Sequence, residues 1–176
     1  MDCDLLVKNG RVVSAEGVDA ADVAVKDGRV AALLAPHVRD GVRAAQVLDA
    51  EGKLVLPGAI DVHAHLNDPG FTWREDFAHG TAAAAAGGVT TVVDMPLQNE
   101  PALTDATIFA RKFEAVRNKA LVDYAFWGGL TGDNLDKMRA LHDAGVTAFK
   151  VFLGPVSPDY RTLSLGVVRE ALEIAS

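Results

Sequence analysis

Residues 58–70 read G-A-I-D-V-H-A-H-L-N-D-P-G, and this stretch decides the fold that we expect. The apolar residues among positions 54–62 predict a short buried strand, and the turn residues at 67–70 end it. Successive side chains of a strand point to opposite faces, so His63 and His65 project from the same face. The pattern predicts a metal site at the carboxyl end of a strand, where α/β barrels carry their chemistry. A histidine pair that only forms hydrogen bonds is the alternative, because two matching residues are a weak motif.

The chain beyond residue 55 alternates strands with helices. Further strands are expected at 89–95, 121–127 and 148–153, and helices at 75–86, at 104–119, from Asp133 onward and at 163–174. Thr104 is expected to cap the second helix, and Phe109, Phe113 and Val116 to form its core-facing stripe. This rhythm is typical of parallel βαβ units, and four such units are expected.

Residues 1–53 have a different rhythm, in which short apolar segments are separated by Asn9-Gly10, Glu16-Gly17, Asp27-Gly28 and Glu51-Gly52. Glycine after asparagine or aspartate is typical of tight hairpin turns, because these positions need a positive φ. The segment predicts a small antiparallel sheet that is part of a β-sandwich. His37 is expected to be a solvated loop residue.

Lys150 interrupts an otherwise apolar strand at 148–153. A buried lysine is unfavourable unless it is paired or neutralised, so this residue needs an explanation. Period-2 alternation places the bulkier apolar residues on one face and Lys150 on the other, which predicts that Lys150 points into the barrel. A lysine that forms an ion pair, or whose amine extends to solvent, is the alternative.

Five motifs carry a resemblance to a known family: H-A-H at 63–65, D-P-G at 68–70, E-D-F-A-H-G-T-A-A-A-A-A-G-G-V-T-T at 75–91, D-M-P at 94–96 and F-K-V-F at 149–152. In this order they resemble the cyclic amidohydrolases, which include dihydroorotase, hydantoinase, dihydropyrimidinase and allantoinase. The resemblance implies the N-terminal half of a metal-dependent hydrolase with a (β/α)8 TIM barrel, preceded by a small β-sandwich segment. We expect the sandwich segment at 1–53 and the first four βα units of an incomplete barrel at 54–176.

The same resemblance implies the composition of the site. His63, His65 and Lys150 are the expected metal ligands, with Lys150 carboxylated on its amine to bridge two divalent ions, expected to be zinc. The family's proton-handling aspartate has no counterpart in the sequence, so it would lie beyond Ser176. We therefore expect no catalytic acid or base in this half, and the chain alone is expected to be inactive.

Two positions bear on the substrate that the resemblance implies. Asn67 stands where dihydroorotases have an arginine that grips the substrate carboxylate, and M-P-L-Q-N at 95–99 is closer to the allantoinase pattern. Asn67 and Asn99 are expected to bind substrate, although Gln98 occupies the position where the family asparagine usually stands. Hydrolysis of a cyclic amide, most like that of allantoinase, is expected. The alternatives are dihydroorotase or hydantoinase/dihydropyrimidinase activity, and a non-catalytic, dihydropyrimidinase-like assembly protein.

Composition limits the partners. The chain has 176 residues, of which 49% are hydrophobic, and a net charge of -7, with no basic stripe to meet nucleic acid. No segment reaches the roughly 18 apolar residues of a membrane span, and the single cysteine suits a reducing cytoplasm. The expected partners are a small cyclic amide and either a second copy or the missing C-terminal half, because half a barrel leaves strand edges unpaired.

Overall fold

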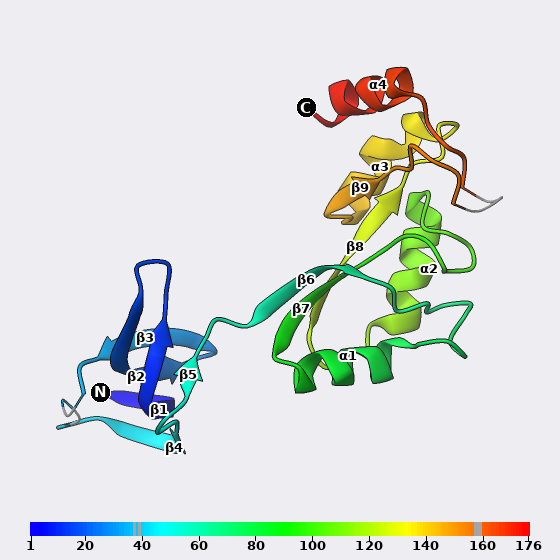
Figure 1. Ribbon diagram of the computed structural model, residues 1–176. Coiled ribbons are helices and arrows are strands. Elements are labelled where there is room, and N and C mark those ends of the chain that lie inside the picture. The colour runs from blue at the N-terminus through cyan, green and yellow to red at the C-terminus, as the bar shows by residue number, and fades with distance from the viewer. Residues whose placement is uncertain (37, 39, 157–159) are drawn as a thin grey trace. The chain divides into compact units, whose positions relative to one another are not determined.

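The computed structural model describes residues 1–36, 38, 40–156 and 160–176 (Figure 1). His37 lies outside these residues. The chain divides into two compact units, Met1–Pro57 and Gly58–Ser176, which are described separately. No helix among the described residues has the length and apolar character needed to cross a membrane.

The first unit is one mixed sheet of five strands in the order β3-β2-β1-β4, with β5 also paired to β1. The strands are β1 (Asp2–Val13), β2 (Val18–Lys26), β3 (Arg29–Leu34), β4 (Arg43–Asp49) and β5 (Leu54–Val55). The predicted antiparallel sheet was wrong in part, because β4 and β5 run parallel to β1. β4 begins beside the start of β1, where Asp2 pairs with Arg43. Cys3, Leu6 and Ala24 form the core.

Two of the predicted turns in this unit behave differently. Asp27 and Gly28 have φ values of 51° and 71° and join β2 to β3 as a hairpin, as predicted. Asn9-Gly10 lies inside β1 instead, at a register shift opposite β2. A Cβ on Gly10 would come within 2.5 Å of Val55, so this glycine lets β5 approach β1 closely.

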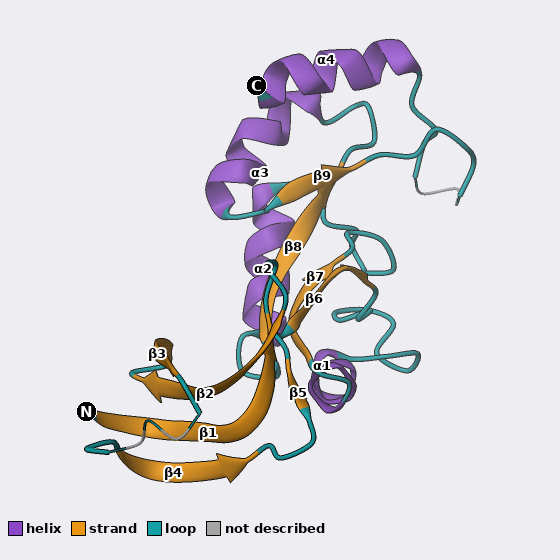
Figure 2. Ribbon diagram, turned by 60° about the vertical axis from the view of Figure 1, so that its left-hand side comes forward, coloured by secondary structure: helices purple, strands orange, loops and turns teal. Residues whose placement is uncertain are grey.

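The second unit is a four-stranded parallel sheet in the order β6-β7-β8-β9, with helices between the strands (Figure 2). Its elements are β6 (Ala59–Ala64), α1 (Phe77–Ala86), β7 (Val89–Asp94), α2 (Ala106–Val116), β8 (Asp123–Gly129), the 3₁₀ helix η1 (Leu135–Lys137), α3 (Met138–Ala144), β9 (Ala148–Lys150) and α4 (Leu165–Ala175). The predicted alternation of strands and helices is confirmed. This is the architecture of part of an α/β barrel.

The single buried strand predicted among residues 54–62 was wrong. Leu54–Val55 pairs with β1 in the first unit, and β6 begins only at Ala59. Leu56, Pro57 and Gly58 separate the two strands, and a Cβ on Gly58 would lie 2.1 Å from the Thr90 side chain. Neither is the strand buried, since 63% of Ile60 is exposed in this unit.

The core of the second unit joins the helices to the strands. Phe77 of α1, Val116 of α2 and Leu141 of α3 pack with Val92 and Phe126 of the sheet. Burial of these side chains, at about 25 cal/mol per Å² of apolar surface, is the main contribution to holding the helices on the strands.

The details of α2 differ from the prediction. Asp105, not Thr104, caps the helix, because its carboxylate accepts a hydrogen bond from the Ile108 N–H at 2.9 Å. The predicted core residue Phe113 is 44% exposed, whereas Lys112 is 1% exposed. A charged residue therefore occupies part of the buried face that was predicted to be apolar.

Two later elements also differ. β9 ends at Lys150 and not at residue 153, because its partner β8 ends at Gly129, the residue in register with Lys150. The helix expected from Asp133 begins as a 3₁₀ turn at Leu135 and becomes α-helical at Met138. His142 lies in the last turn of α3.

Candidate metal centre

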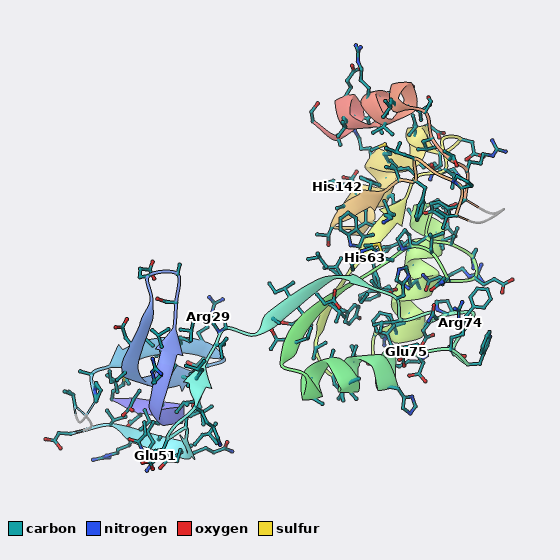
Figure 3. The ribbon with its side chains drawn as sticks, viewed as in Figure 1. Arg29, Glu51, His63, Arg74, Glu75 and His142 are labelled. Atoms are coloured by element: carbon teal, nitrogen blue, oxygen red, sulfur yellow. The ribbon has the colours of Figure 1, made fainter. Side chains whose placement is uncertain are left out.

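The candidate metal centre lies at the carboxyl ends of the parallel strands. Ala64 of β6 is in register with Asp94 of β7, and Gly129 of β8 with Lys150 of β9. Because these strands are parallel, their last residues meet at one edge of the sheet. His63 lies near the end of β6 and His65 directly follows the strand, and Figure 3 labels His63 at this edge.

One cavity of about 260 Å³ collects the predicted ligands. It is lined by His63, His65, Met95, Leu97, Gln98, Lys150, Phe152 and Val156. The two imidazole rings have centroids 5.4 Å apart and are tilted by 46°. The structure therefore brings both histidines and Lys150, which are separated by more than 80 positions in the sequence, to one space.

The donor atoms in this cavity suit divalent metal ions. Burial lowers the pKa of His65, which favours the neutral imidazole that ligates metals. Lys150 is half-buried, and its Nζ lies 4.9 Å from the ring centre of Phe152. Over the described ranges, no carboxylate pairs with the Lys150 amine, and no three His, Cys, Asp or Glu residues gather as a metal cluster. Two imidazoles therefore line this cavity together with a lysine amine that has no carboxylate partner among the described residues.

The two predicted substrate residues lie outside this cavity lining. Asn67 has φ 51° and is 5% exposed; its amide donates to the His65 carbonyl at 3.3 Å. Its Oδ1 is buried and has no partner among the described residues. Asn99 lines a neighbouring cavity of about 440 Å³. Its amide donates to the Met95 and Leu97 carbonyls, both at 3.0 Å.

The structure contains a buried ion pair beside the cavity that the sequence analysis did not predict. Lys112 Nζ donates to Asp94 Oδ2 and to Asn99 Oδ1, each at 2.5 Å, and to the Asp68 carbonyl at 3.1 Å. Lys119 Nζ donates to the carboxylate of Asp68 at 2.8 Å. Two buried aspartates, 0% and 2% exposed, thus each have a lysine partner.

Burial controls the electrostatics of this pair. It raises the pKa of Asp94 and lowers the pKa of Lys112, and the attraction between the two charges opposes both shifts. Such a pair needs all its hydrogen bonds to offset the loss of water. A signal was present in the sequence, because Lys112 stands three residues after Phe109 and four before Val116, within the buried helical stripe.

Main-chain hydrogen bonds also join the two loops that follow β6 and β7. Gly70 and Asn99 form an antiparallel bridge, and the Glu100 N–H donates to the Pro69 carbonyl at 2.9 Å. Figure 3 labels Arg74 and Glu75 on the first of these loops. The backbone beside the cavity is therefore fixed by hydrogen bonds and not only by packing.

In the metal-free protein, the pKa values of two histidines are expected to shift in opposite directions from the ordinary value near 6.5. The Asp76 carboxylate, 2.8 Å from His79 Nδ1, raises the pKa of His79, whereas burial lowers that of His65. The contribution of His79 to stability is present below pH 6.5 and is lost as pH rises through its folded-state pKa. That of His65 is present above pH 6.5 and is lost as pH falls through its lower folded-state pKa. NMR titration of the ring protons measures both, and coincident midpoints would contradict the assignment.

Comparisons with known proteins place these residues in a family context. A model of the amidohydrolase family matches residues 54–155. The chain is 44% identical over 158 residues to an allantoinase of Streptomyces avermitilis and 42% identical over 174 residues to one of Rubrobacter xylanophilus. These alignments cover 90% and 98% of this chain. Among solved structures, an L-hydantoinase (dihydropyrimidinase) from Arthrobacter aurescens matches 98% of the chain with a TM-score of 0.91 and 38% identity.

The matched proteins are much longer than this chain. It spans 35% and 37% of the two allantoinases and 38% of the hydantoinase chain. The aligned part of each relative therefore corresponds to about a third of its length.

Proposed function

Because this chain belongs to the amidohydrolase family, as the motifs in its sequence predicted, we propose that it is the N-terminal part of a metal-dependent hydrolase that opens a cyclic amide ring. The complete protein closes a (β/α)8 barrel around the cavity, and residues 1–57 contribute to a β-sandwich. Allantoin is the preferred substrate, which the names of the curated relatives support. Hydantoinase activity is the second candidate, supported by the likeness to the Arthrobacter enzyme.

One observation carries the proposal: His63, His65 and Lys150 line the same cavity at the carboxyl ends of β6 and β9. Histidine is a common ligand of zinc, and a carboxylated lysine would add an anionic group with two donor oxygens. These three residues would hold two divalent ions, with Lys150 carboxylated between them. The ions, when bound, supply Lewis acidity and lower the pKa of a coordinated water.

Asn67 and Asn99 lie outside the cavity lining, and their proposed roles rest on their polar groups. Asn67 offers a buried acceptor, Oδ1, which an N–H of the ring or its substituent would satisfy. Phe152 and Met95 line the cavity with apolar surface, which limits access of bulk water. Asn99 is held by three hydrogen bonds, so any contact with substrate uses its remaining acceptor capacity.

The full-length protein that contains this chain is expected to hydrolyse allantoin with a kcat/KM more than about tenfold above that for dihydroorotate. Asn67 lacks the charge needed to bind a substrate carboxylate, and a hydrogen bond to a charged group contributes about 1.5–3 kcal/mol. Steady-state assays on allantoin, hydantoin and dihydroorotate measure the preference. Comparable kcat/KM on dihydroorotate would refute the allantoin assignment. A protein with no bound metal and no activity on any of the three would instead support the non-catalytic assembly role.

A further inference from the structure

Lys112 joins three segments of the second unit through one ammonium group. A lysine has three N–H donors, and all three are used here: by Asp94 Oδ2 at the end of β7, by Asn99 Oδ1 in the following loop, and by the Asp68 carbonyl in the loop after β6. The side chain is 1% exposed. Because this amine lies where the loops after β6 and β7 meet, it fixes the distance between them and places a positive charge there.

The connection reaches one of the predicted ligands through Asp94. Asp94 Oδ2 binds Lys112, and Oδ1 accepts a hydrogen bond from the Leu66 N–H at 2.8 Å. Leu66 directly follows His65 in the sequence. One carboxylate therefore binds the amine with one oxygen and the main chain beside His65 with the other. A rotation of this carboxylate would break its hydrogen bond to the main chain next to the imidazole.

The surroundings of the amine favour a single orientation. Its Nζ lies 5.5 Å from the ring centre of Phe77 and 5.1 Å from that of Phe126. These rings exclude water from the pair and add cation–π attraction. In such a place a hydrogen bond is stronger and more directional than in water, so the geometry is fixed before any ligand binds.

We propose that Lys112 is a positioning residue of the candidate metal centre, which holds the Asp94 carboxylate in the orientation that fixes the main chain at His65. The inference rests on the proposed function in so far as His65 is a metal ligand. Lys112 does not line the candidate cavity, so it would act on the metal centre through Asp94. A purely structural lysine would balance the buried charge and would have no separate effect on the metal.

The test compares Lys112→Met with the double variant Lys112→Met/Asp94→Asn in the full-length protein. The double variant removes both buried charges and leaves an amide oxygen that can accept from Leu66. Its urea midpoint is expected to return near that of the unaltered protein. Its affinity for Zn²⁺, measured by calorimetric titration of the metal-free protein, is expected to stay at least tenfold weaker. Its Leu66 amide is expected to exchange with solvent at least tenfold faster, with the Val92 amide in the middle of β7 unchanged.

The matched control is Lys119→Met. This lysine also pairs with a buried aspartate, at 2.8 Å, but it contacts neither Asp94 nor Asn99 in the described structure. Zinc affinity and Leu66 exchange are expected to stay within twofold of the unaltered protein.

Each other outcome overturns the inference. A double variant with restored stability, zinc affinity and Leu66 protection would mean that Lys112 only balances charge. A double variant that does not fold would assign Lys112 to the fold itself. If the unaltered protein binds no zinc, the proposed function fails, and Leu66 exchange in the metal-free proteins still decides whether Lys112 fixes this backbone.

Discussion

Replacing Lys150 with alanine in the full-length protein is expected to lower bound metal to one equivalent or less per site and to reduce turnover by more than about 100-fold. Changing a residue that hydrogen-bonds to a metal ligand already lowers metal affinity or activity by about 10–100-fold. Changing a ligand that bridges two metals should lower them more. The fold should persist, because Lys150 is half-buried and pairs with no acid in the described part of the chain. Metal analysis by mass spectrometry and kcat/KM on allantoin are the two measurements.

Lys137→Ala is the matched control for this experiment. Lys137 forms an ion pair with Asp105 at 3.4 Å on the surface, with 49% of its side chain exposed, so its removal changes charge without touching the cavity. It should retain full metal content and activity. Full metal and activity in the Lys150 variant would show that Lys150 is an ordinary structural lysine and would remove the central support for a two-metal site.

The parts of the site that could be predicted from sequence follow from local rules. The two-residue repeat of a strand puts His63 and His65 on one side, whatever else the chain does. The alternation of strands with helices then predicts a parallel sheet, which brings the end of β9, with Lys150, to the same edge. Neither step needs information on distant contacts, and so both could be made before the structure was known.

The features that sequence did not reveal depend on distant partners. Lys112 reaches Asn99, Asp94 and Asp68 over 13, 18 and 44 positions, and only these acceptors make its burial possible. The stripe of α2 was predicted to be apolar because a helical period reports which face is buried, and not which polar groups lie opposite it. Asn67 was predicted from its place in a motif, whereas the burial of its Oδ1 without a partner among the described residues depends on the tertiary structure.

In the first unit, the strand pairing likewise depends on distant residues. Glycine after asparagine predicted a hairpin at Asn9-Gly10, but the Asn9 N–H donates to the Asp22 carboxylate at 2.8 Å, inside a continuing strand. The parallel pairing of β1 with β4 joins residues about 41 positions apart, such as Leu5 and Gln46. No turn motif between neighbouring strands can report a pairing of this kind.

Asp94→Ala is expected to destabilise the protein by about 3–5 kcal/mol, the usual cost of removing one partner from a buried ion pair. The change leaves the Lys112 ammonium, 1% exposed, without a counter-charge and the Leu66 N–H without its acceptor. A single domain is typically stable by about 5–15 kcal/mol, so the variant should lose a large share of its stability.

Urea unfolding followed by circular dichroism measures this loss, with Asp94→Asn and Lys137→Ala as comparisons. Asp94→Asn keeps an oxygen for Leu66 and should retain part of the stability, since only the charge is lost. Lys137→Ala breaks a solvent-exposed pair with Asp105 and should cost less than about 1 kcal/mol. Because the second unit alone contains Asp94, its loss of stability should also appear as faster amide exchange in β7 and α2, with β1 and β2 unaffected. An Asp94→Ala protein as stable as the Lys137 variant would mean that Lys112 becomes neutral at little cost, and the buried pair would then not be a determinant of this fold.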